Sequence, residues 1–246
     1  MKLLARILLV IIIVSSAGYG YWRYDSQDRM HRVTPEALAA LQSDAAVSIS
    51  QEQWIVFTPA GASPTRGMIF YPGGECDERG YAEPLREIAA AGYLVVLVPM
   101  PLQLAVFAPD SATEVIAAFP EIQSWAIAGH SLGGSMAARY THHHPDNIDG
   151  LILWDAYAPD DMTDSSAKIM MIHRSDETGT VPSDYVAKLP LLPEQTEFVP
   201  LKGAQHLNYG RFIAGRLYRD APTAELDPEE HRTMAAAASI SFMDEL

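Results

Sequence analysis

Short apolar runs of strand length alternate with helical stretches along most of this chain. Several runs are nearly continuous valine, isoleucine and leucine, which is typical of strands buried on both faces. Strands of this kind, each followed by a helix, form a mostly parallel sheet covered on both sides. The pattern therefore predicts a doubly wound α/β fold. The expected strands cover residues 54–58, 67–71, 94–99, 124–128, 150–154, 168–173 and 196–200.

The expected helices cover residues 81–91, 112–119, 131–143, 182–189 and 228–243. Asp227 suits the cap of the last helix and Pro228 its first position. A shorter helix is expected after Thr34, with Pro35 at its first position. A chain of 246 residues with 48% hydrophobic content can bury the core of one such domain, and we find no linker that would divide it.

The pentapeptide Gly-His-Ser-Leu-Gly at residues 129–133 joins an expected strand to an expected helix. It matches the G-x-S-x-G elbow, in which a serine occupies a sharp, strained turn and the glycines keep the flanking positions free of side chains. In a sheet of this kind, ligands gather at the carboxyl ends of the strands, where such a turn lies. Ser131 is therefore the candidate nucleophile.

With this elbow on a central strand, residues 54–243 resemble the α/β-hydrolase family, and most of all its small, lidless members related to dienelactone hydrolases and bacterial carboxylesterases. The resemblance implies an α/β-hydrolase fold and a serine followed along the chain by an acidic residue and a histidine. The chemistry needs both partners, because the imidazole accepts the serine proton and the carboxylate orients the imidazole.

Asp176 follows the expected strand 168–173 and stands in the acid position of the family. His206 follows the strand 196–200 after a turn that contains a glycine, and it is the candidate base. We expect Asp176 to be the acid. Asp155 is the alternative, because it ends an earlier strand and some hydrolases use that position. Either carboxylate could instead cap a helix or belong to a surface loop.

The tetrahedral intermediate of ester cleavage carries a negative charge that backbone N–H groups must meet. Leu132, which follows the nucleophile, should supply one N–H group. The loop Pro-Gly-Gly-Glu at 72–75 looks like the oxyanion loop of the family, and we expect Gly74 or Glu75 to supply the other. An ordinary Pro-Gly turn is the alternative.

No metal ion or other cofactor is expected. The histidines at 142–144 end a helix, where solvated cations are more typical than a metal site. His130 and His173 have no partner at metal-ligand spacing. The single cysteine, Cys76, excludes an internal disulfide and a cysteine-based metal cluster.

Only residues 156–167 separate Asp155 from the next expected strand, which leaves no room for a lid domain. Access to the serine would instead be shaped by residues 100–110 and 208–223. The apolar and aromatic side chains of these segments favour an apolar acyl or aryl substrate, although core packing explains them equally well. They are Phe107, Tyr209, Phe212, Leu217 and Tyr218.

The amino-terminal segment departs from the composition of a soluble domain. Lys2 and Arg6 are followed by an unbroken aliphatic run at 7–14. Residues 3–22 are enough to span the roughly 30 Å hydrocarbon core of a bilayer as a helix. Aromatic side chains suited to the interface end the segment: Tyr19, Tyr21 and Trp22.

We expect a transmembrane anchor at 1–22, a connecting arm at 23–47 and the α/β-hydrolase domain at 48–246. A signal peptide cleaved near the small residues Ser15 and Ala17 is the alternative. Basic residues ahead of the apolar run tend to remain cytoplasmic, so the domain should lie on the extracytoplasmic side. It would be held there by a single span, or secreted or periplasmic after cleavage.

The formal net charge of −14 would repel a phosphate backbone, so nucleic-acid binding is not expected. The sequence predicts a serine hydrolase that cleaves small carboxylic esters through an acyl-enzyme. A dienelactone or lactone hydrolase, or an acyltransferase, could use the same triad. A third alternative is a non-catalytic domain that binds a ligand or partner, because a fold does not prove a function. The sequence does not indicate the oligomeric state.

Overall fold

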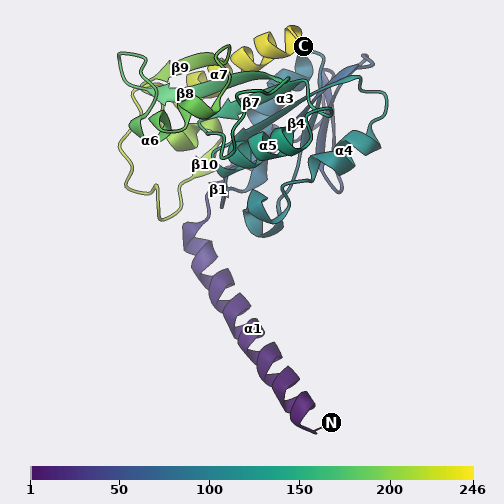
Figure 1. The fold of residues 1–246 in the computed structure, drawn as a ribbon, viewed down its shortest axis with the longest axis vertical. Coiled ribbons are helices and arrows are strands. Elements are labelled where there is room, and N and C mark those ends of the chain that lie inside the picture. The colour runs from purple at the N-terminus through teal and green to yellow at the C-terminus, as the bar shows by residue number, and fades with distance from the viewer. Residues whose placement is uncertain (1) are drawn as a thin grey trace.

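The computed structural model describes residues 2–246 and contains one long helix and an α/β domain (Figure 1). The helix, α1 (Lys2–Arg29), projects from one end of the domain. It is long and apolar enough to be a membrane span or a signal, and its apolar window is not buried by the domain. Met1, the first residue of the segment expected at 1–22, lies outside the described residues.

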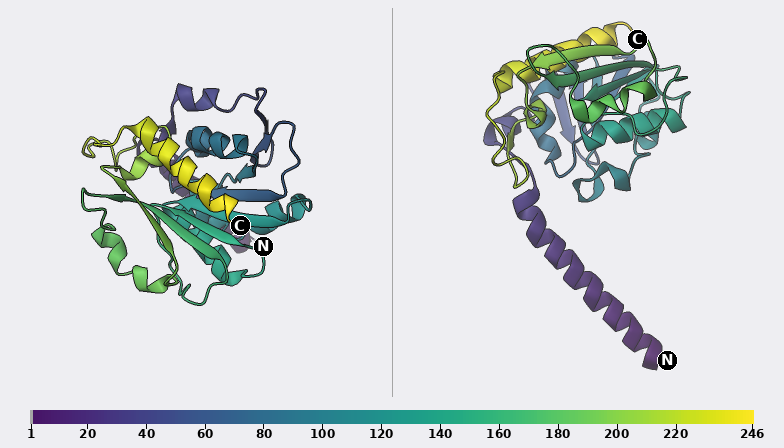
Figure 2. Two further views of the ribbon diagram at one scale, coloured as in Figure 1. Left: turned by 90° about the horizontal axis from the view of Figure 1, so that it is seen from above. Right: turned by 60° about the vertical axis from the view of Figure 1, so that its left-hand side comes forward.

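A twisted sheet forms the centre of the domain (Figure 2). Its strands are β2 (Val47–Gln51), β3 (Ile55–Pro59), β4 (Arg66–Tyr71), β5 (Leu94–Leu97), β6 (Ser124–His130), β7 (Gly150–Trp154), β8 (Lys168–Ser175) and β9 (Glu197–Lys202). The spatial order is β2-β3-β5-β4-β6-β7-β8-β9. β3 pairs antiparallel with β2 and β5, and the strands from β5 onward pair in parallel. The expected doubly wound, mostly parallel sheet is therefore confirmed.

Helices cover both faces of this sheet (Figure 2). They are α2 (Pro35–Ala39), α3 (Ala82–Ala90), α4 (Ala112–Ala118), α5 (Leu132–His143), α6 (Ser183–Val186) and α7 (Pro228–Asp244), with 3-10 turns at η1 (Glu78–Tyr81), η2 (Pro101–Gln103), η3 (Ala105–Phe107), η4 (Leu189–Leu191) and η5 (His206–Tyr209). One buried cluster joins α3 and α7 to the sheet through residues such as Phe70 and Trp154. A second cluster joins α4 and α5 to the other face through residues such as Ile127 and Leu153. Burial of these two apolar layers holds the strand ends, and therefore the site, in place.

Three features of the fold differ from the expected elements. β2 is an edge strand whose outward side chains are polar, so it lacks the apolar run by which the buried strands were recognised. A second small sheet pairs β1 (Arg32–Val33) with β10 (Phe212–Ile213) and ties the segment after α1 to the domain. α1 itself continues past Trp22 as far as Arg29.

Candidate active site

The elbow lies between β6 and α5, at the carboxyl end of the central strand. Ser131 has a φ of 51° and a ψ of −123°, a conformation that costs energy in any residue other than glycine. Two contacts hold it there: its N–H donates to the carbonyl of Trp154 at 3.1 Å, and α5 begins at the next residue. A Cβ on Gly129 would lie 2.6 Å from the backbone of Gly133. The glycines are therefore required by the closeness of strand and helix.

His206 lies directly beside this serine. Its Nε2 is 2.9 Å from the Ser131 Oγ, although 75 residues separate the two along the chain. The turn η5 that begins at His206 follows β9, as expected for the base. The half-buried imidazole is thus placed to accept the hydroxyl proton of Ser131.

The carboxylate that meets His206 belongs to Asp155, which corrects our preference for Asp176. The Asp155 Oδ2 lies 2.6 Å from the His206 Nδ1, and the Asp155 side chain is fully buried. Asp155 directly follows β7, the neighbour of β6, so its carboxylate reaches the gap between the elbow and η5. The residue held as the alternative is the one that completes a Ser-His-Asp arrangement.

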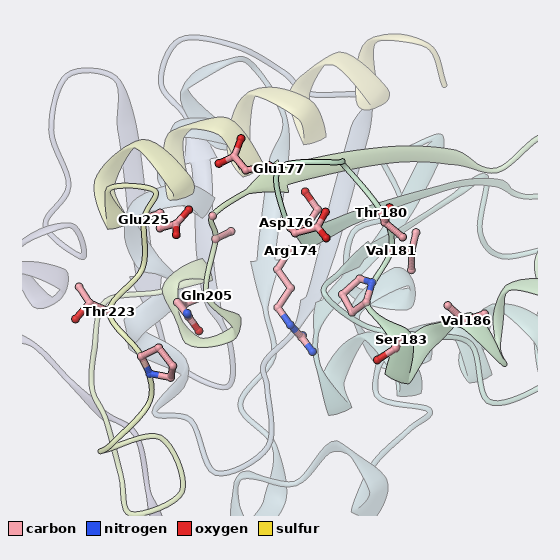
Figure 3. A pocket seen from close by; sticks show the side chains of 15 residues that line it. Arg174, Asp176, Glu177, Thr180, Val181, Ser183, Val186, Gln205, Thr223 and Glu225 are labelled. Carbon is pink, nitrogen blue, oxygen red and sulfur yellow. The ribbon is translucent and has the colours of Figure 1, made fainter.

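Asp176 lies elsewhere for a reason that its neighbours explain. β8 ends two residues later than expected, at Ser175, so Asp176 lies in the loop beyond the carboxyl end of the strand. Its exposed carboxylate accepts from the N–H of Thr178 at 2.9 Å and from the Thr178 hydroxyl, and these bonds lower its pKa. Asp176 lines a separate pocket of about 710 Å³. Figure 3 shows the Arg174 guanidinium extending away from the Asp176 side chain. The Asp-x-Thr spacing, typical of a local turn, was a signal that could have been read in the sequence.

Two further side chains bond to Asp155, one at its carboxylate and one at its backbone carbonyl, and neither was foreseen. The Arg174 Nη1 donates to the Asp155 Oδ2 at 2.5 Å, and it also donates to the Tyr185 hydroxyl at 3.1 Å. The Tyr185 hydroxyl donates to the Asp155 carbonyl at 2.7 Å. Burial would raise the pKa of Asp155, but the hydrogen bond and charge of His206, with the charge of Arg174, outweigh it and hold the pKa at about 2. The carboxylate therefore stays ionised throughout the physiological range.

The three N–H groups that we expect to bind an oxyanion differ in their surroundings. Leu132 and Gly74 adjoin each other, and a Cβ on Gly74 would lie 3.1 Å from the Leu132 side chain. Among the described residues, neither of their N–H groups has a hydrogen-bond acceptor in the protein. The N–H of Glu75 already donates to the Gln103 carbonyl at 2.9 Å, which removes Glu75 from the candidate donors. Leu132 and Gly74 remain as the pair.

His130, the variable residue of the elbow, links these parts together. Its buried Nδ1 lies 2.7 Å from the Tyr81 hydroxyl, and its Nε2 lies 2.8 Å from the backbone carbonyl of His206. Burial lowers the pKa of His130 well below its usual range, so the ring is neutral. Because a carbonyl only accepts, Nε2 carries the proton and Nδ1 accepts from Tyr81. The Tyr81 oxygen accepts the N–H of Gly73 at 3.1 Å, so one chain of bonds connects the oxyanion loop to the histidine.

This series of hydrogen bonds was not predicted from the sequence. The middle position of a G-x-S-x-G elbow admits many residue types, and Tyr81 lies in an ordinary helical start. The contact from His130 to His206 spans 76 residues. No local pattern could therefore have indicated it.

Two cavities flank Ser131. The larger, of about 290 Å³, is lined mainly by side chains from α5 and from the loop after β7, including Met136 and Tyr157, together with Tyr185 of α6. The smaller, of about 180 Å³, lies between the oxyanion loop and the segment after η5, where Leu217 and Tyr218 line it. Leu132 lines both cavities. Ser131 also lines both cavities.

The other access residues named from the sequence have different surroundings. Tyr209 is fully buried in the core, and Phe212 packs against the same cluster, so core packing accounts for both. Phe107 is exposed on η3. His142 and His143 stand at the carboxyl end of α5. Within the part of the chain that the structure describes, no group of three or more His, Cys, Asp or Glu side chains is placed to hold a metal ion.

Comparison with known protein families gives a match over residues 67–226, well over half of the chain, to the model of the alpha/beta hydrolase family. No curated relative of the sequence was found.

Solved structures with the same fold are distant in sequence. A ferulic acid esterase from Streptomyces cinnamoneus has 12% identity and a TM-score of 0.55, with 76% of this chain and 68% of the esterase covered. A predicted CIB-like hydrolase from Thermoplasma acidophilum has 16% identity and a TM-score of 0.56, with 81% of this chain and 100% of that chain covered. A structure reported for the metagenome-derived lipolytic enzymes LipS and LipT has 12% identity and a TM-score of 0.52, covering 82% of this chain and 98% of that chain. At these identities the likeness establishes the shared fold.

Proposed function

Because this chain belongs to the alpha/beta hydrolase family, we propose that it is a serine hydrolase that cleaves carboxylic esters through Ser131, His206 and Asp155. The proposal rests above all on the hydrogen-bonded series from the Ser131 Oγ through the His206 ring to the Asp155 carboxylate, with distances of 2.9 Å and 2.6 Å. Residues so far apart in sequence meet in the order that nucleophilic catalysis needs. The esterase and lipolytic names among the structural neighbours support the ester class.

In this reaction the Ser131 Oγ attacks the ester carbonyl carbon while the His206 Nε2 takes the hydroxyl proton. Asp155 holds the Nδ1–H of His206 and stabilises the imidazolium that forms. The N–H groups of Leu132 and Gly74 meet the charge on the carbonyl oxygen. His206 then gives its proton to the leaving alcohol, and a water activated in the same way releases the carboxylic acid and restores Ser131.

The cavities on either side of Ser131 favour small substituents at the ester bond. Cavities of about 290 Å³ and 180 Å³ lie at or below the lower end of the range for pockets that bury drug-sized ligands. An apolar cavity of roughly 150 Å³ is enough for benzene. We therefore propose short acyl or single-ring groups next to the ester bond.

We also propose that residues 1–22 anchor the enzyme as a single span, with residues 23–47 as the arm and the domain from 48 onward on the extracytoplasmic side. The length and apolar composition of α1 support this, and a signal sequence would share both properties. Amino-terminal sequencing of the protein purified from membranes tests it. A mature chain that begins near Gly18 and needs no detergent would replace the anchor by a signal peptide.

Covalent labelling by a fluorophosphonate probe tests the proposed function. The wild type should be labelled, Ser131→Ala should not, and Ser166→Ala, which changes an exposed loop serine, should be labelled like the wild type. Hydrolysis of p-nitrophenyl esters of graded chain length should fall with the same variant. Equal labelling of Ser131→Ala and wild type, or no labelling of either, would favour a non-catalytic binding domain.

A further inference from the structure

The end of α1 is bonded to the loops that surround Ser131. Arg29 forms an ion pair with Glu75 of the oxyanion loop. We call residues 23–32 the stem. Asp28 of the stem pairs with Arg219, and the Asp28 backbone carbonyl accepts the N–H of Arg216 at 2.7 Å. α1 is therefore attached to the domain at the mouth of the candidate active site, on both sides of that mouth.

His31, two residues after the end of α1, is part of the pocket wall. The N–H of His31 donates to the Glu75 carbonyl at 2.8 Å, and its carbonyl accepts the N–H of Asp77 at 2.9 Å. Its ring accepts the N–H of Gly215 at 3.0 Å, and it lines the cavity of about 180 Å³ together with Ser131. One wall of the cavity of about 180 Å³ is therefore formed by a residue that lies two positions after the end of α1.

The distance from the apolar part of α1 to this pocket is short. Trp22 closes the aromatic belt, and Asp25, which pairs with Arg216, lies three residues later, roughly 4.5 Å along the helix axis. Arg29 lies roughly 10 Å beyond Trp22 by the same rise. The headgroup layer on each side of a bilayer is roughly 5–8 Å thick. A spanning α1 would therefore hold Asp25 within the headgroup layer and Arg29, at the pocket mouth, just outside that layer.

Apolar side chains are exposed on the same end of the domain. Figure 1 shows β1 and β10 beside the upper end of α1. The turns η2 and η3 adjoin the oxyanion loop, because the Gln103 carbonyl accepts the Glu75 N–H at 2.9 Å. Phe107 is 58% exposed, Ile213 49% and Leu217 70%. Large apolar side chains that gather around a binding site mark a surface that contacts a partner or a membrane.

The charge at this end differs from that of the rest of the chain. The whole chain carries a net charge of −14, whereas residues 23–32 and 211–219, the stem and the loop bonded to it, hold six of its 17 lysines and arginines and two of its 31 acidic residues. Four of these arginines pair with carboxylates of the stem or of the domain. Anionic headgroups would meet less repulsion here than elsewhere on the domain. The continuity of this surface with α1 places the bilayer within reach.

We propose that the active-site mouth rests on the bilayer through Phe107, Ile213 and Leu217, and that the substrate is a membrane-resident ester whose apolar chain stays in the lipid during cleavage. The inference builds on the proposed hydrolase function. The two small cavities accept the groups beside the ester bond, while a long chain leaves through the mouth along Leu217 into the bilayer. Water is consumed, and the carboxylic acid and alcohol return to the two phases according to their polarity.

The test uses the full-length protein in vesicles of phosphatidylcholine and the anionic lipid phosphatidylglycerol, with a fluorogenic diacyl lipid ester in the bilayer and p-nitrophenyl butyrate in the water. Phe107→Asp and Ile213→Asp should each lower hydrolysis of the lipid ester about tenfold, because each loses the burial of one apolar side chain in the interface. Hydrolysis of the butyrate should be unchanged. Phe198→Asp, on β9 at the far edge of the sheet and 40% exposed, is the matched control and should change neither rate.

A second measurement does not depend on activity. Phe107→Cys and Phe198→Cys, each labelled with an environment-sensitive fluorophore, should differ on reconstitution, with a blue shift of emission at position 107 alone. Equal spectra at the two positions, or a loss of lipid-ester hydrolysis no greater than that of Phe198→Asp, would overturn the inference while leaving the hydrolase intact. A wild type that cleaves neither ester would instead overturn the proposed function.

Discussion

Two residues at the centre of the site have backbone conformations that residues other than glycine rarely adopt. Ser131 has a φ of 51° and Asp155 a φ of 44°. Each follows a parallel strand, and each N–H donates to the neighbouring strand, that of Ser131 to Trp154 and that of Asp155 to Ile172 at 2.7 Å. The sheet thus supports the strain that turns the hydroxyl and the carboxylate toward His206. Strain maintained at two adjoining strand ends is typical of a functional site.

The identity of the acid is testable by substitution. Asp155→Asn should lower kcat about 10³- to 10⁴-fold, because the imidazole loses the carboxylate that fixes its tautomer and stabilises its positive charge. Asp176→Asn should change kcat less than about twofold, because its carboxylate is exposed and bonded only within its own turn. Steady-state kinetics on p-nitrophenyl butyrate compare the two. A large loss at Asp176 with little loss at Asp155 would contradict the geometry.

Tyr81 should act as a positioning residue through His130. Tyr81→Phe leaves the Gly73 N–H and the His130 Nδ1 without their partner, so the oxyanion loop and the His206 backbone lose a shared support. We expect kcat to fall about 10- to 100-fold with little change in KM, as for small displacements of reacting groups. Tyr93→Phe, whose hydroxyl bonds Asp244 far from the site, is the control. A change confined to KM, or to thermal stability, would argue for a merely structural role.

At the scale of elements, the elbow depends on how closely β4 approaches α5. A Cβ on Gly133 would lie 2.2 Å from the Tyr71 carbonyl oxygen and 2.3 Å from that of Pro72. These are backbone atoms at the end of β4, which cannot turn away as a side chain could. The glycine at this position therefore sets the spacing between the nucleophile turn and the oxyanion loop.

Gly133→Ala should consequently disturb this junction. We expect a loss of about 1–3 kcal/mol in the free energy of unfolding, seen as a fall in Tm of several degrees (about 2–4 °C per kcal/mol) in thermal unfolding followed by circular dichroism. Gly20→Ala, at a position where an added Cβ meets nothing within 4 Å, is the control. An unchanged Tm for Gly133→Ala would mean that the elbow can open without cost.

At the scale of the whole molecule, one buried histidine, His31, lies where the stem meets the domain, and another, His231, lies on α7 within the domain. Burial, with a smaller contribution from the charge of His206, lowers the pKa of His31 to about 4. Burial likewise lowers the pKa of His231, on α7, to about 4. Both rings are therefore neutral in the folded protein at pH values where the unfolded chain would already protonate them.

The fold should therefore lose stability in mild acid. Between the unfolded pKa of about 6.5 and the folded pKa of about 4, the unfolded state binds more protons, so the free energy of unfolding falls as the pH falls through this window. Each pKa unit corresponds to about 1.4 kcal/mol. Urea unfolding at pH 7.5, 6.5, 5.5 and 4.5 measures the decline, and His231→Phe should make it shallower. A flat profile over this range would contradict the burial of these rings.

Much of this architecture was predictable from short-range pattern. The expected strand 150–154 matches β7 in both bounds, and Ser131 lies on a strand-to-helix turn as its flanking glycines indicated. Periodic burial and the steric need for glycine act over a few residues, so a single sequence displays them. β2 was not predicted because an edge strand needs no apolar run. The role of the neutral His130 was not predicted because its partners are distant in sequence.

The choice between Asp155 and Asp176 could not be made from short-range sequence patterns. Both follow strands that end at the same edge of the sheet, and which carboxylate reaches His206 depends on the position of β7 beside β6 and on the two extra residues of β8. Those residues bring Arg174 to the Asp155 carboxylate and carry Asp176 out to solvent. The contact of α1 with the oxyanion loop has the same origin. Residue types and local periods can be read from the chain, but contacts between distant segments arise from sheet order and register, which no local window contains.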